Sequence, residues 1–292
     1  MEKEIEEDIK RAINSVFNEQ DSYGLTTGFT DLDDLMHGLY DGEMMVVGSG
    51  PGMGKTSFAL NVMYHVAVKK RIPVVYFSLE HSTEQLYSRL LSIDSMVELD
   101  HIRTGEMDDK EKLKIDISKK NLEQAPIHII DDVNTFKVSD IERKCIELKR
   151  EENIGLIILD YFGLIDADCD NNTRLPLGDR RQQKMCEVSK KIKEMTMKLS
   201  VPVMVLTTLR YRSLEMRKDH IPQMKDLRYL GSLETDADVV IFIHRDDYYD
   251  EEAYKRGIAD IIIAKHRNGA TGSIELAWIE KFTRYANFAR EW

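Results

Sequence analysis

The sequence predicts an α/β fold with a mostly parallel central sheet flanked by helices, and two observations carry this prediction. First, an apolar strand at residues 44–48 runs directly into a glycine-rich turn that ends Gly-Lys-Thr. Second, continuous apolar runs rich in β-branched residues recur along the chain and alternate with helical patterns. Such runs are typical of parallel strands that are buried on both faces of a sheet.

The expected elements follow one another along the whole chain. An amphipathic helical pattern comes first, at residues 2–20, and a turn-rich segment at 24–33 separates it from the core. This helix either lies on its own domain or docks on a neighbouring subunit, and its pattern alone does not decide between the two. We therefore divide the chain into an N-terminal helix, residues 1–21, and a core domain, residues 22–292. After the strand at 44–48 and a helix that continues from Ser57, we expect strands at 74–79, 127–130, 156–159, 203–206, 239–243 and 258–264, and two further strands near a hairpin at 272–278 and 282–285.

Composition excludes several classes of protein. The chain has 292 residues and a formal net charge of −11, which argues against a protein coated in nucleic acid but allows a local basic channel. It contains no apolar run of about 20 residues and opens with no signal-peptide pattern. Its three cysteines, Cys145, Cys169 and Cys186, are widely spaced and lack a metal-ligand pattern. This cysteine usage predicts a reducing, cytoplasmic setting.

The glycine-rich turn predicts a phosphate-binding loop. Glycines at 50, 52 and 54 let backbone N–H groups approach a phosphate without Cβ clashes. We expect Lys55 to reach the outer phosphates and Thr56 to hold Mg²⁺, at the positive end of the following helix. The one departure from the strict pattern is Ser49, which stands where the first glycine is usual. The predicted nucleotide-binding residues are Ser49, Gly50, Pro51, Gly52, Met53, Gly54, Lys55, Thr56 and Ser57.

Three later strands end in polar residues that suit the same chemistry. Asp160 closes the apolar strand at 156–159 and is expected to hold Mg²⁺ through water. Glu80 closes the strand at 74–79 and is expected to orient or deprotonate the attacking water, because Ser82 and Gln85 already provide a capping box for the next helix. Thr208 follows the strand at 203–206, where a polar side chain would face the γ-phosphate, although an amide would reach further.

A pair of cations marks the end of a later strand. Lys265 and Arg267 lie in the segment Lys265-His266-Arg267-Asn268-Gly269, at an expected tight turn between two strands. Such a pair is often only solvated surface. In a ring of subunits it would instead stabilise charge on a neighbour's γ-phosphate, which is worth about 10³–10⁵ in rate.

Together these segments make residues 22–288 resemble the C-terminal ATPase domain of the DnaB-type hexameric replicative DNA helicases, within the RecA-like superfamily. The resemblance lies in many dispersed segments that occur in the right order: Gly24 to Asp33, Pro51 to Thr56, Phe77 to Glu80, Ile102 to Gly105, Gly155 to Tyr161, Asp226 to Arg228, Gly231 to Asp238 and Lys265 to Gly269. The family also lacks glycine at the position of Ser49.

The resemblance implies a RecA-like P-loop NTPase fold and a ring-forming motor that uses ATP and Mg²⁺. It implies a homo-hexamer that moves on single-stranded DNA and that meets primase or a helicase loader. It places Lys55 and Thr56 at the nucleotide, Glu80 as catalytic base and Asp160 at Mg²⁺. It also places Lys265 and Arg267 in trans on the next subunit's nucleotide. The N-terminal helix then becomes a linker helix that clasps a neighbour.

Three departures from the family stand out. Only about 20 residues precede the core, so the family's N-terminal domain is absent from this sequence, as in an excised domain or a short protein from a phage or mobile element. The family's sensor glutamine falls at Thr208, which weakens the expected coupling of hydrolysis to DNA. The loop after Asp160 is acidic, with Asp166, Asp168 and Asp170, where a channel loop would be basic.

DNA contacts are expected in the two loops that follow the strands ending at Asp160 and Leu206. Basic side chains there could contact phosphates without reading sequence, although lysine and arginine populate any solvated loop. The candidates are Arg174, Arg180, Arg181 and Lys184 in the first segment and Arg210, Arg212, Arg217 and Lys218 in the second.

Two other functions remain open at this point. A nucleotide-switched assembly or loader protein would bind ATP and DNA without unwinding, and Thr208 and the missing N-terminal domain favour it. A RecA-like recombinase is a third interpretation, but the segments Asp226 to Asp238 and Lys265 to Gly269 argue against it. DNA-stimulated hydrolysis would favour the motor, and nucleotide-dependent assembly with negligible turnover would favour the switch.

Overall fold

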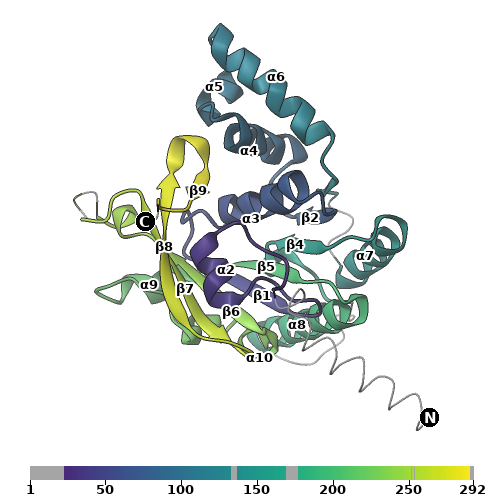
Figure 1. Cartoon of the computed structure of the whole chain (residues 1–292). Helices are drawn as coiled ribbons and strands as arrows, with labels where there is room; N and C mark the ends of the chain where they lie inside the picture. Colours follow the sequence, from purple (N-terminus) through teal and green to yellow (C-terminus); the bar gives the residue numbers. More distant parts are fainter. Residues whose placement is uncertain (1–22, 133–136, 169–176, 251, 253, 290–292) are drawn as a thin grey trace.

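A nine-stranded sheet forms the centre of the computed structural model, which describes residues 23–132, 137–168, 177–250, 252 and 254–289 (Figure 1). The strands lie in the order β3-β2-β4-β5-β1-β6-β7-β8-β9. The first six in this order are parallel: β3 (Ile127–Ile130), β2 (Val74–Ser78), β4 (Leu156–Asp160), β5 (Val203–Thr208), β1 (Met44–Ser49) and β6 (Val239–His244). The last three are antiparallel: β7 (Ile258–His266), β8 (Gly272–Ile279) and β9 (Arg284–Ala286). The predicted mostly parallel sheet is confirmed.

Helices cover both faces of the sheet, as continuous apolar strands require. Alternate residues of β1 divide between the two cores: Met45 and Val47 pack with one set of helices, Met44 and Val46 with the other. The first set is α2 (Thr30–Met36), α3 (Lys55–Tyr64) with its π-helical extension His65–Lys69, and α4 (Thr83–Ser95). The second set is α7 (Val138–Glu152), α8 (Leu177–Leu199), α9 (Tyr211–Glu215) and α10 (Leu233–Asp236).

A helical projection rises from one end of the sheet. Figure 1 shows α4, α5 (Leu99–Thr104) and α6 (Asp109–Glu123) stacked beyond α3, with α6 outermost. Short 3₁₀ turns complete the described chain at Phe162–Leu164, Met224–Leu227, Asp246–Tyr248 and, as η7, at Glu280–Phe282. Within the described ranges, no helix combines the length and the apolar character needed to cross a membrane. The N-terminal helix expected at residues 2–20 lies outside the described residues.

Two strands, β5 and β7, extend two residues beyond their predicted ends. β5 continues to Thr208 because that residue pairs with Ser49 of β1. β7 continues to His266, since Lys265 and His266 pair with Val240 and Val239 of β6. The expectation that Lys265 and His266 stand in a tight turn is therefore wrong: both are strand residues, and the turn begins at Arg267.

Candidate active site

The phosphate loop, residues 50–54, lies at the carboxyl end of β1 and leads into α3. Gly52 and Gly54 have φ values of 72° and 94°, in the left-handed region that favours glycine. A Cβ at Gly52 would also stand 2.9 Å from the Tyr248 ring, and one at Gly54 would collide with the Tyr285 hydroxyl. The loop shape therefore requires glycine at both positions.

The nine predicted nucleotide-binding residues divide into two groups. A cavity of about 570 Å³ is lined by Pro51, Gly52 and residues 54–57. The other three residues, Ser49, Gly50 and Met53, do not line the cavity. Ser49 is buried and donates a hydrogen bond to the Gly50 carbonyl at 2.8 Å, and the Met53 side chain is buried beneath the loop. Serine at position 49 thus satisfies a loop carbonyl from within.

Asp160 is the buried acceptor at the centre of the site. Its Oδ2 accepts hydrogen bonds from Thr56 Oγ1 at 2.7 Å and from the Tyr76 hydroxyl at 2.6 Å, and the residue is 1 % exposed. Hydroxyl and carboxylate oxygens are the ligands that Mg²⁺ prefers, usually with waters and substrate phosphates completing the shell. Among the described residues, no three His, Cys, Asp or Glu side chains are grouped so that they could hold a metal ion. One hydroxyl and one carboxylate supply part of a Mg²⁺ shell, so Thr56 and Asp160 fit Mg²⁺ held jointly with a nucleotide.

Lys55 is a cation close enough to this carboxylate to interact with it electrostatically. Its Nζ donates to the Gly50 carbonyl at 3.3 Å. Burial lowers the pKa of Lys55, and the charges of Asp160 and Glu80 oppose that shift. A bound phosphate would add a further negative charge beside the ammonium group and favour its protonated form.

Glu80 lines the same cavity, just beyond the end of β2. The expected capping box of α4 is confirmed: Gln85 N donates to Ser82 Oγ, and Ser82 N donates to Gln85 Oε1 at 3.2 Å. Glu80 is thus not needed as a cap. Thr208 also lines the cavity, at the end of β5.

Several lining residues were not singled out from the sequence. Two of them, His81 and Tyr161, directly follow Glu80 and Asp160 in the chain. The others come from segments that the parallel strands do not bring together: Arg89, Leu99, Trp278, Glu280 and Thr283. Arg89 is a partly buried cation from α4, and burial lowers its pKa. Burial lowers the pKa of His81 too, and the charge of Arg89 acts in the same direction. Tyr161 and Glu280 directly follow β4 and β8, which is a local signal, whereas Arg89, Leu99 and Trp278 carry no signal of this kind.

Lys265 and Arg267 lie near the amino-terminal ends of β1 and β6, whereas the phosphate loop lies at the carboxyl end of β1. The Arg267 backbone N–H donates to the Asp238 carbonyl, and Asp238 N donates to the Met44 carbonyl, so Arg267 is level with the start of β1. At about 3.3 Å per residue, six residues of strand put this point about 20 Å from the loop. Neither cation can serve the phosphate loop of its own chain.

Both cations are held by the carboxyl end of α10. Lys265 Nζ donates to the carbonyls of Glu234, Thr235 and Ala237 at 2.8, 3.1 and 2.6 Å. Arg267 donates to the Thr235 carbonyl at 2.5 Å and lies 3.3 Å from Asp238. Burial lowers the pKa of Lys265, and the neighbouring charge of Arg267 lowers it further.

The predicted DNA-contacting residues of the first segment surround the start of α8. Arg181 is exposed, and Arg180 is partly buried. Lys184 forms an ion pair with Asp166 at 3.4 Å, and Lys191 forms one with Asp168 at 2.5 Å. Both described acidic side chains of this loop are therefore paired with lysines of α8, and Asp170 lies outside the described residues. Arg174 lies outside the described residues.

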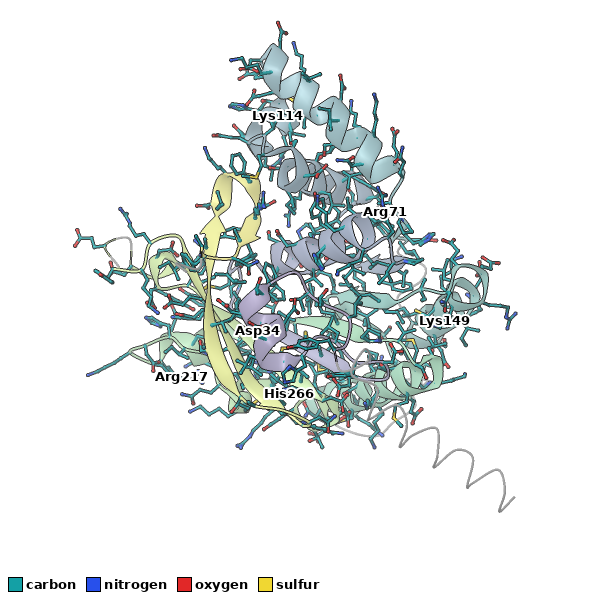
Figure 2. The ribbon with its side chains drawn as sticks, in the orientation of Figure 1. Asp34, Arg71, Lys114, Lys149, Arg217 and His266 are labelled. Carbon is teal, nitrogen blue, oxygen red and sulfur yellow. The ribbon has the colours of Figure 1, made fainter. Side chains whose placement is uncertain are left out.

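The cations of the second segment fall into two groups. Arg212 and Lys218 are exposed. Arg210 is stacked over the Tyr229 ring at 4.0 Å. Arg217, labelled in Figure 2 beside α9, forms a two-pronged ion pair with buried Asp226 and is 14 % exposed. This geometry favours a structural role for Arg217, whereas Arg212 and Lys218 are available to a ligand.

Sequence comparison matches the "DnaB-like helicase C terminal domain" family model to residues 24–287. Replicative DNA helicase DnaB of Geobacillus stearothermophilus is 39 % identical over 267 residues, which cover 91 % of this chain and 57 % of the relative. Replicative DNA helicase DnaC of Bacillus subtilis (strain 168) is 38 % identical over 270 residues, which cover 92 % and 58 %. The chain thus spans somewhat more than half the length of these curated relatives.

Solved structures agree with the sequence matches. A protein solved as an isolated ATPase domain superposes with a TM-score of 0.87 at 28 % identity, covering 98 % of each chain. A DnaB-like replicative helicase, described together with its interactions with primase, has the same TM-score and identity and covers 97 % of this chain and 66 % of its own. A KaiC-like protein of Pyrococcus horikoshii OT3, at 16 % identity and a TM-score of 0.60, shares the fold.

Proposed function

This chain belongs to the DnaB-like helicase C-terminal domain family, and on that premise we propose that it is an ATP-driven motor of a replicative DNA helicase. It acts as a ring of identical subunits, hydrolyses ATP between neighbours, translocates on single-stranded DNA and separates the duplex. The observation that carries the proposal is the convergence of Lys55, Thr56, Glu80 and Asp160 on one cavity.

Each of these residues has a defined task. Lys55 neutralises the outer phosphates, and Thr56 with Asp160 holds Mg²⁺ against them. Mg²⁺ supplies charge stabilisation on the transferred phosphoryl group. Tyr76 fixes the Asp160 carboxylate by its hydrogen bond. Glu80 accepts the proton of the attacking water or orients that water.

The two distant cations complete the site only in an assembly. Lys265 and Arg267 are too far from their own phosphate loop, so they act on the nucleotide of the next subunit. This arrangement supports a head-to-tail ring, because each interface would join one subunit's phosphate loop to the opposite edge of the next subunit's sheet. The expected oligomeric state is a homo-hexamer.

Single-stranded DNA would pass beside the starts of α8 and α9. Arg181, Arg212 and Lys218 would contact its phosphates, with affinity that falls as salt rises. Arg180, Lys184 and Arg210 already have partners in this chain and would contribute less. Primase or a helicase loader are further partners that binding experiments can test.

The test is steady-state ATP hydrolysis with and without single-stranded DNA, with Lys55→Ala as the control. Stimulation by DNA that disappears in Lys55→Ala supports the motor. A second candidate function is an ATP-switched DNA-binding assembly or loader protein, which Thr208 at the strand end favours because its side chain is short. ATP-dependent assembly with negligible turnover would select this second function.

A further inference from the structure

The lining of the cavity beside the phosphate loop extends beyond the residues expected to contact the phosphates. The sheet order places β4 and β5, which carry Asp160 and Thr208, on one side of β1. Trp278, Glu280 and Thr283 line the cavity from the other direction, because β8 and η7 fold back over the loop. Figure 1 shows β9 lying beside α3. One part of the cavity therefore suits the phosphates, and the β8–η7 part is left for the rest of the nucleotide.

The β8–η7–β9 turn is fixed to the phosphate loop. The Tyr285 hydroxyl donates to the Met53 carbonyl at 2.9 Å, and Asn61 Nδ2 of α3 donates to the Thr283 carbonyl at 3.2 Å. The six-membered ring of Trp278 lies 3.6 Å from the position that a Cβ would occupy on Gly54. Trp278 thus stands directly against the loop.

Glu280 places a carboxylate in this part of the cavity. Its side chain is exposed, and among the described residues it forms no ion pair. The next residue, Lys281, is instead paired with Glu98 of the helical projection at 2.9 Å. A carboxylate near a triphosphate is repelled by it, so Glu280 is tolerated best where a ligand offers hydrogen-bond donors.

From this geometry we infer that Glu280 accepts hydrogen bonds from the ribose hydroxyls of the bound nucleotide. The inference rests on the proposed function, because it requires a nucleotide on the 50–54 loop. Ribose is the first group beyond the phosphates, and its two hydroxyls are donors that a carboxylate accepts. Acidic side chains hold ribose hydroxyls in this way in dinucleotide-binding folds. Glu280 therefore selects the sugar, and the base lies further out.

The test is calorimetric binding of ADP, 2′-deoxy-ADP and 3′-deoxy-ADP to the full chain, with Mg²⁺ present. A hydrogen bond to a charged acceptor predicts that removal of the hydroxyl weakens binding about 10-fold or more. In Glu280→Ala this ratio should fall to about 1–2, since the acceptor is gone. Glu275→Ala is the matched control: Glu275 lies on β8, pairs with Lys255 at 2.6 Å, and does not line the cavity. It should keep the wild-type ratio.

The possible failures are distinct. If the wild-type chain does not bind ADP, the proposed function fails and the inference fails with it. If ADP binds but both deoxy analogues bind as tightly as ADP does, the proposed function stands and the sugar contact is refuted. If Glu280→Ala keeps the wild-type ratio, or alters the ratio of ADP to GDP instead of the sugar ratio, Glu280 is not the ribose ligand.

Discussion

Replacement of Arg267 by alanine separates a structural role from a role in trans. The guanidinium group donates to the Thr235 carbonyl and lies 3.3 Å from Asp238, yet its side chain is 43 % exposed. The backbone hydrogen bond from Arg267 to Asp238 is kept in the variant. An ion pair of this exposure contributes about 0–1 kcal/mol to the free energy of unfolding. Arg267→Ala should therefore fold with nearly wild-type stability.

The catalytic cost should be far larger. A cation supplied in trans to a transferred phosphoryl group is worth about 10³–10⁵ in rate, which corresponds to about 4–7 kcal/mol of activation free energy. Lys265 is a poorer test, because its ammonium group donates to three carbonyls and its removal would take a donor from each of them. ATP hydrolysis and urea unfolding should both be measured for Arg267→Ala. We expect a large loss of hydrolysis rate and only a small loss in the free energy of unfolding.

Mixing two inactive variants then locates the residue. Arg267→Ala subunits keep Glu80, and Glu80→Gln subunits keep Arg267. In an equal random mixture about a quarter of head-to-tail interfaces pair an intact Glu80 with an intact Arg267. Hydrolysis should recover to about that fraction of the wild-type rate. No recovery of hydrolysis in assemblies shown to contain both variants would refute action in trans. A large loss of stability in Arg267→Ala would indicate that the residue has a structural role instead.

Three further substitutions test other parts of the site. Glu80→Gln should bind ADP as the wild type does and hydrolyse ATP about 10²–10⁴-fold more slowly, because the general base is lost; weakened ADP binding in calorimetry would indicate a structural role instead. Tyr76→Phe removes a buried hydrogen bond to the Asp160 carboxylate, so urea unfolding should show a loss of about 1.5–3 kcal/mol, and hydrolysis should need more Mg²⁺; unchanged stability and Mg²⁺ dependence would contradict the assignment. Thr208→Gln replaces a short hydroxyl side chain at the end of β5 by a longer amide. It should raise the DNA-stimulated rate of ATP hydrolysis about fivefold, the factor that one hydrogen bond of about 1 kcal/mol supplies. An unchanged rate would show that the length of this side chain does not limit the coupling of hydrolysis to DNA.

The strands and the phosphate loop could be predicted because their signals are local. An apolar run buried on both faces, such as Leu156–Asp160, reads the same way whatever its neighbours are. The loop requires glycines with positive φ at positions 52 and 54, and the sequence supplies them. Glu80, Asp160 and Thr208 could be grouped because parallel strands end at one edge of a sheet.

The remaining features depend on contacts between distant segments. The pairing of Tyr76 with Asp160 follows from β2 lying beside β4, and the folding of Trp278 and Glu280 over the loop follows from the antiparallel strands at the far end of the sheet. Arg217 looked like a free cation, but Asp226 nine residues later holds it. Figure 2 places His266 at the far end of β7, and there α10 holds Lys265 and Arg267, a contact that no periodicity encodes.

Directional movement on DNA tests the central claim most directly. Streptavidin bound to one end of a biotinylated single-stranded oligonucleotide should be released by the wild-type chain only with hydrolysable ATP and Mg²⁺, and released from one end faster than from the other. Lys55→Ala should release none. Release of this kind would establish a motor, whereas DNA-stimulated hydrolysis with no release from either end would contradict translocation and favour the nucleotide-switched assembly.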